Sequence, residues 1–146
     1  MKNKDLIIKR ANLFTLVQWL RQIPLTVEMT RERTRFIKSC SYVIEEMEAR
    51  RIEMIKKYCN KDDKGEPIML DNDGVMEFDF EDDKKELFKK EYEEFAKEEV
   101  NITQDNNKSK FQSIRDILAN TSFEFKGILA DEYNSWCEAF DSIDFS

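Results

Sequence analysis

The sequence predicts an α+β fold that is mainly α: a long helical hairpin bearing a β-hairpin, closed by short aromatic-rich helices. Only three glycines and two prolines occur among 146 residues, so few positions interrupt a helix. Hydrophobic residues make up 40% of the chain, which is enough for a core. Charged residues make up 38%, against about 25% in an average soluble protein. A chain of this length is typical of one domain, and we expect a single domain over residues 1–146.

Charge divides the expected domain into three parts. Residues 1–59 are helical and net basic. Residues 60–103 hold an acidic β-hairpin, a helix and a short strand, and residues 104–146 hold a polar loop and aromatic C-terminal helices. Residues 62–99 alone carry 16 acidic and 6 basic side chains. Either the two halves pair their charges within the fold, or the acidic face is offered to a basic partner.

The first two elements are expected to be helices. Apolar residues recur at helical spacing within residues 6–22, and Pro24 ends that pattern. Thr26 can cap a second helix that extends to about residue 59. Its apolar seam alternates steps of three and four, as in a coiled coil or a long helical hairpin. The seam consists of Ile37, Cys40, Ile44, Met47, Arg51, Met54 and Tyr58. It pairs either within the chain or between two chains.

A β-hairpin is predicted over residues 68–80, because apolar and acidic residues alternate from Met76 to Phe80 and Asp73-Gly74 is a favoured turn pair. A third helix follows from Asp82 or Asp83 to about Glu99. Its apolar face is formed by Leu87, Phe88, Tyr92 and Phe95. Residues 100–103 then alternate as a short strand.

Aromatic residues concentrate in the last third of the chain. A polar loop is expected over residues 104–110, followed by a short helix with apolar residues at 111, 114, 117 and 118. Residues 129, 133, 136 and 140 keep helical spacing in a final helix. Seven aromatic residues from Phe111 onward exceed what a lone terminal helix needs. They form either the core of the fold or an anchor for a partner.

Little in the sequence points to catalysis or to a cofactor. The chain has no histidine, which removes the commonest general base and metal ligand. The three cysteines have no paired spacing and are expected to be small apolar residues on helix faces. Asp71-Asn72-Asp73-Gly74 places glycine at the fourth position instead of the sixth that a calcium loop needs. We therefore expect a non-enzyme without cofactor or metal. No motif or apolar run indicates direct nucleic-acid or membrane binding.

The middle of the chain resembles a family of short tailed-bacteriophage (siphophage or prophage) proteins of unassigned function. The resemblance rests on residues 52–67, on the acidic hairpin, and on residues 86–102, where a helix ends in a Glu-Val strand. Residues 128–140 resemble the closing helix of that family. The resemblance covers roughly residues 20–142 and implies a bacteriophage origin, with the protein in the host bacterial cytoplasm or in the virion. It carries over no catalytic residue.

These features predict a function based on protein–protein interaction. The first hypothesis is a virion structural or assembly component of the neck or tail, which docks on other phage proteins or forms a homo-oligomer. The alternative is an acidic inhibitor that occupies a basic groove of a host defence protein. The candidate interaction surface consists of Asp79, Glu81, Asp82, Asp83, Trp136 and Phe140.

Overall fold

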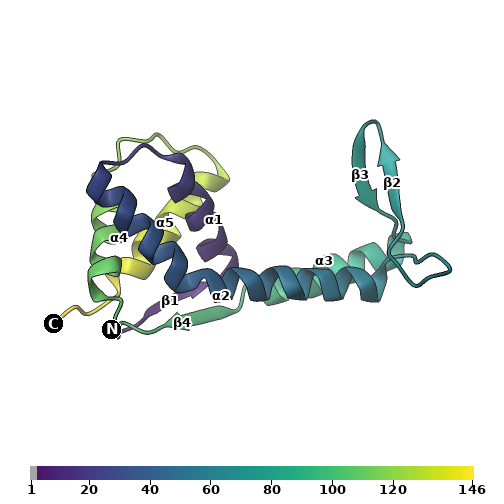
Figure 1. Cartoon of the computed structure of the whole chain (residues 1–146), viewed down its shortest axis with the longest axis horizontal. Helices are drawn as coiled ribbons and strands as arrows, with labels where there is room; N and C mark the ends of the chain where they lie inside the picture. The colour runs from purple at the N-terminus through teal and green to yellow at the C-terminus, as the bar shows by residue number, and fades with distance from the viewer. Residues whose placement is uncertain (1–2) are drawn as a thin grey trace. The chain divides into compact units, whose positions relative to one another are not determined.

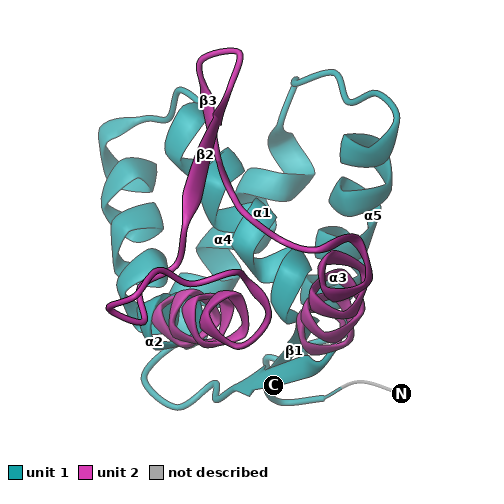
Figure 2. Cartoon of the chain, turned by 90° about the vertical axis from the view of Figure 1, so that its right-hand side faces the viewer, with its two compact units in different colours: residues 1–44, 98–146 teal, residues 45–97 magenta. Residues whose placement is uncertain are grey.

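The computed structural model describes residues 3–146 and confirms the predicted α+β, mainly α fold (Figure 1). Helices and strands follow one another as β1 Leu6–Lys9, α1 Arg10–Gln22, α2 Val27–Tyr58, β2 Met69–Asn72, β3 Val75–Phe78, α3 Asp82–Ala96, β4 Glu99–Ile102, α4 Lys108–Asn120 and α5 Ile128–Asp141. The chain divides into two compact units (Figure 2). The first unit comprises residues 1–44 and 98–146, and the second unit comprises residues 45–97. The single domain over residues 1–146 stays a prediction, which one cooperative unfolding transition would bear out.

The first unit contains a two-stranded antiparallel sheet. In it β1 pairs with β4, with Leu6 opposite Ile102 and Lys9 opposite Glu99. The prediction of a helix from residue 6 was therefore wrong for its first four residues. Leu6 and Ile8 are buried, and the residues between and after them are less so, which is the alternation of a strand. The predicted end of α1 at residue 22, just before Ile23-Pro24, is confirmed.

The long helix α2 begins where the sequence predicts. The Met29 N–H donates a hydrogen bond to Thr26 Oγ1 at 3.3 Å, so Thr26 caps the helix. The buried stripe differs from the predicted seam in part, because Phe36 and Val43 are buried where Ile37 and Ile44 were expected. The buried residues of the stripe are Phe36, Cys40, Val43, Met47, Met54 and Ile55.

Aromatic side chains fill the core of the first unit. Trp136 and Phe140 of α5 are both 0% exposed. The Trp136 indole Nε1 donates a hydrogen bond to the Asn12 carbonyl oxygen at 2.8 Å, and the Phe140 ring lies 5.9 Å from the Phe36 ring. The assignment of Trp136 and Phe140 to an interaction surface was therefore wrong. The alternative interpretation, that the aromatic residues of the C-terminal helices form the core of the fold, is the correct one.

Part of the segment after β4, which the sequence predicts to be a polar loop, is helical. Helix α4 begins at Lys108, inside the range expected to be a loop. The Gln104 side-chain Nε2 donates to the Lys4 carbonyl at 2.7 Å and to the Asp144 carbonyl at 2.9 Å. These bonds join the segments near both ends of the described chain. A polar residue in this position thus has a structural role that its composition alone does not reveal.

We expect Cys40 to be unreactive in the folded protein. All three cysteines are free thiols; Cys40 and Cys59 are buried, while Cys137 is half-buried. Burial raises the pKa of Cys40 to about 12, so its thiol stays protonated and non-nucleophilic at neutral pH. Titration with Ellman's reagent should show that native protein protects Cys40, whereas all three thiols react in urea. Rapid modification of Cys40 under native conditions would contradict the burial described here.

Candidate protein-interaction surface

The second unit is built on a helical hairpin. The C-terminal half of α2 runs antiparallel to α3, since Lys57 Nζ lies 3.3 Å from Glu91 Oε1 and the Arg50 guanidinium lies 5.2 Å above the Phe95 ring. Between the helices lies a small core of Met47, Met54 and Phe95, with Phe88 and Tyr92 packed against it. This half of the apolar seam therefore pairs within the chain.

A β-hairpin connects the two helices. Strands β2 and β3 are antiparallel, with Asn72 directly opposite Val75. The turn residues Asp73 and Gly74 have φ angles of 51° and 85°, the backbone that a two-residue turn of type I′ requires. The Gly74 N–H also donates to the Asp71 carboxylate at 2.9 Å. The predicted hairpin and its turn are thus confirmed.

The base of the hairpin is fixed by one asparagine. The Asn60 N–H donates to the Asp79 carbonyl at 2.8 Å, and the Asn60 carbonyl accepts from the Ile68 N–H at 2.9 Å. The Asn60 side-chain Nδ2 donates to the Asp79 carboxylate at 3.1 Å. Next to it, Phe80 stacks on Phe88 of α3 at 5.2 Å. The hairpin therefore leaves the helical hairpin in a defined orientation within the second unit.

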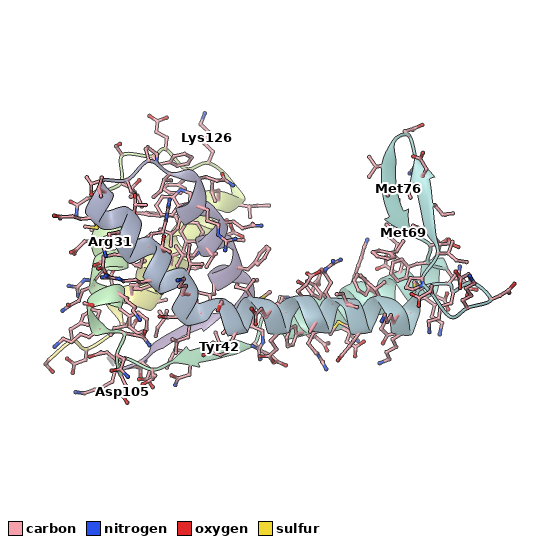
Figure 3. The ribbon with its side chains drawn as sticks, in the orientation of Figure 1. Arg31, Tyr42, Met69, Met76, Asp105 and Lys126 are labelled. Carbon is pink, nitrogen blue, oxygen red and sulfur yellow. The ribbon has the colours of Figure 1, made fainter. Side chains whose placement is uncertain are left out.

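Large apolar side chains are exposed on both faces of this hairpin. The exposed fractions are 44% for Met69, 50% for Leu70, 59% for Val75 and 56% for Met76. The register places Met69 and Met76 on one face, and Leu70 and Val75 on the other. Figure 3 shows Met69 near the base of the ribbon and Met76 closer to its turn. Exposed apolar side chains grouped on one element in this way make the hairpin a candidate contact site.

Acidic residues surround this apolar group. Residues 60–83, which we call the acidic hairpin, contain ten acidic and two basic side chains. Of the candidate residues chosen from the sequence, Glu81 lies at the N-cap of α3, and Asp82 and Asp83 lie in its first turn. Negative charge at these positions interacts favourably with the dipole of the helix. Asp79 is half-buried and bonded to Asn60. The four acids thus lie together at the base of the hairpin, and Trp136 and Phe140 lie in the core of the other unit.

Sequence reasoning missed the four apolar residues of the hairpin as candidate site residues. The signal was present in the sequence: Met69-Leu70 and Val75-Met76 are each two consecutive apolar residues. Consecutive residues of a strand point to opposite faces, so these two pairs place apolar side chains on both faces of the hairpin. When only one face packs against the rest of the fold, the apolar side chains of the other face stay exposed.

The described residues offer no evident metal centre. Within residues 3–146 no three His, Cys, Asp or Glu side chains are arranged to hold a metal ion. In the same part of the chain, every helix is too short or too polar to cross a membrane. No family model matches the chain, and no curated protein or solved structure is significantly similar to it. The phage resemblance accordingly stays a prediction.

Replacing Asn60 with alanine is expected to loosen the acidic hairpin without unfolding the first unit. The substitution removes the side-chain bond to Asp79 and leaves a half-buried carboxylate with one donor fewer, at a cost of about 1–2 kcal/mol. Amide hydrogen exchange at residues 69–78 should accelerate severalfold. Exchange in α4 and α5 serves as the internal control and should not change. Equal acceleration in both units would show that Asn60 acts globally.

Proposed function

We propose that this protein acts without catalysis, by binding another protein through the acidic hairpin. The observation that carries the proposal is the group of four half-exposed apolar side chains on a ribbon rich in carboxylates. A hairpin alone is marginally stable, and this one is anchored at its base by Asn60 and Phe80. A preorganised ribbon loses little conformational freedom on binding, which favours affinity.

The fitting partner has an apolar groove with a basic rim. The apolar side chains would enter the groove, and the carboxylates would steer the encounter and exclude acidic proteins. A second copy of this hairpin would bring ten acidic residues against ten others, which opposes pairing between two hairpins. We therefore propose a partner of different sequence.

In line with the phage resemblance, we propose that the partner is another phage protein and that this chain is a structural or assembly component of a virion neck or tail. A second candidate is the inhibitor of a bacterial anti-phage defence protein. The density of negative charge in residues 60–83 favours this second candidate, since such a ribbon suits a basic groove that normally holds nucleic acid.

Site-specific photo-crosslinking tests the proposal. A photoreactive phenylalanine analogue replaces Met76 in one variant and Tyr42 in a control variant. Tyr42 is 53% exposed, close to the 56% of Met76, and belongs to the first unit (Figure 3). Crosslinking in phage-producing and in phage-free bacterial cells should yield an adduct from position 76 that position 42 does not give.

The identity of the adduct decides between the candidates. A virion protein, present only in phage-producing cells, supports the structural or assembly role. A basic host protein, present in both kinds of cell, supports the inhibitor. The yield of this adduct must also fall when Met69→Ser is added. Adducts of equal yield at both positions, or none from position 76, would overturn the proposal of a binding hairpin.

A further inference from the structure

We infer that the free edge of β1 in the first unit binds an extended basic peptide segment as an added strand. A cleft of about 390 Å³ is lined by residues of β1, of its neighbour β4, and of helices α1 and α5. It is lined among others by Asp5, Ile7, Lys9, Glu99, Ser135 and Glu138. This site belongs to a different unit from the acidic hairpin, so the inference does not depend on the proposed function.

The register of the sheet shows which backbone groups face the cleft. The Arg10 N–H donates to the Glu98 carbonyl at 3.0 Å, in line with the pairing of Leu6 with Ile102 and Ile8 with Val100. Hydrogen-bonded pairs alternate along an antiparallel ladder, so even-numbered residues of β1 bond to β4. The N–H and C=O groups of Asp5, Ile7 and Lys9 then point away from β4. Asp5, Ile7 and Lys9 all line the cleft, together with Ile8.

One end of this edge already accepts a neighbouring segment. The Asn3 N–H donates to the Ser142 carbonyl at 2.7 Å, and the Asp144 N–H donates to the Asn3 carbonyl at 2.6 Å, which forms a parallel bridge between Asn3 and Ile143. Within residues 3–146 the sheet has only two strands, β1 and β4. The bridge involves Asn3 and ends before residue 5, and the cleft extends from Asn3 and Ser142 of this bridge to Asp5, Ile7 and Lys9.

The charged side chains that line the cleft indicate which class of ligand it binds. Three carboxylates, of Asp5, Glu99 and Glu138, line the cleft together with one ammonium group, that of Lys9. One oxygen of the Asp5 carboxylate accepts a hydrogen bond from the Gln104 N–H at 3.2 Å. Glu99 and Glu138 are exposed at its rim. An added strand presents alternate side chains to each face, so cationic side chains at every second position would meet these carboxylates. The ligand class is therefore an extended peptide segment with alternating Lys or Arg, in which backbone pairing supplies attachment and charge supplies selectivity.

The test uses the full chain, labelled with ¹⁵N, and a blocked peptide of four Lys-Thr repeats. A peptide of four Glu-Thr repeats is the control. We expect the basic peptide to shift the amide signals of Asp5, Ile7 and Lys9 and to slow their hydrogen exchange at least fivefold, whereas the acidic peptide changes neither. Unchanged exchange at these amides under saturating basic peptide would overturn the inference. Protection confined to residues 69–78 would overturn it as well, because the peptide would then bind the acidic hairpin.

Two variants separate backbone pairing from charge. Ile7→Pro removes an N–H that points away from β4 and so leaves the ladder bonds to β4 in place. It should weaken binding of the Lys-Thr peptide at least tenfold, whereas Ile7→Val should not. Glu99→Lys with Glu138→Lys changes two exposed side chains and should weaken binding to a similar degree. Because position 99 lies opposite Lys9, far-ultraviolet circular dichroism first checks that this variant is folded. Binding that survives this double charge reversal would refute the basic ligand class. Met69→Ser with Met76→Ser should leave binding intact.

Discussion

Replacing Trp136 with alanine is expected to lower the free energy of unfolding by about 3–5 kcal/mol. Trp136 is 0% exposed, and its ring lies 5.4 Å from Trp19 and 6.3 Å from Phe125. The substitution removes these contacts, leaves a cavity, and deletes the hydrogen bond to the Asn12 carbonyl. Since small proteins are stable by about 5–15 kcal/mol in total, this loss is a large fraction of the free energy of unfolding.

Urea denaturation followed by far-ultraviolet circular dichroism measures this loss. Trp136→Phe is the matched control, because it keeps an aromatic ring but loses the indole N–H; its cost should be about half as large or less. The experiment also decides between the two readings of the aromatic C-terminal helices. A residue that anchors a partner would leave stability within about 0.5 kcal/mol of the wild type when replaced, as surface substitutions do. That result would contradict the buried position of Trp136.

Local signals in the sequence were sufficient to predict the structural features that depend only on neighbouring residues. Thr26 begins α2 because its hydroxyl can bond an N–H three residues onward, and this needs no tertiary contact. Asp73-Gly74 forms a tight turn because both residues tolerate positive φ. The end of α1 before Pro24 follows from the steric effect of proline on the preceding residue. Each of these predictions is confirmed.

Elements that depend on distant residues could not be predicted in the same way. Leu6–Lys9 forms a strand because β4 lies beside it, although some ninety positions separate the two in the sequence. The same holds for the candidate site. Helical spacing placed Trp136 and Phe140 on one face of α5, but only the packing of Phe36 and Trp19 shows that this face is covered. Exposure is a property of the assembled unit, and periodicity alone does not determine it.

The hairpin acids are expected to control how fast the partner binds. For the protein crosslinked at position 76, Asp82→Lys with Asp83→Lys should reduce the association rate constant about tenfold at low salt, because steering by these charges is lost and reversed. The difference should shrink as ionic strength rises. Stopped-flow measurement at several salt concentrations gives both results. Asp105→Lys, on an exposed acid of the first unit, is the control and should leave the rate unchanged.

The hairpin methionines are expected to control how long the complex lasts. Met69→Ser with Met76→Ser removes apolar contacts that form only after docking, so the dissociation rate constant should rise about 10–100-fold while association changes little. Both side chains are about half exposed in the free protein, so their loss leaves folding nearly unaffected. Tyr42→Ser is the apolar control in the first unit. The opposite result would be a lower association rate constant for the methionine variant and a higher dissociation rate constant for the acid variant. It would contradict this assignment and place the carboxylates, instead of the methionines, at the centre of the interface.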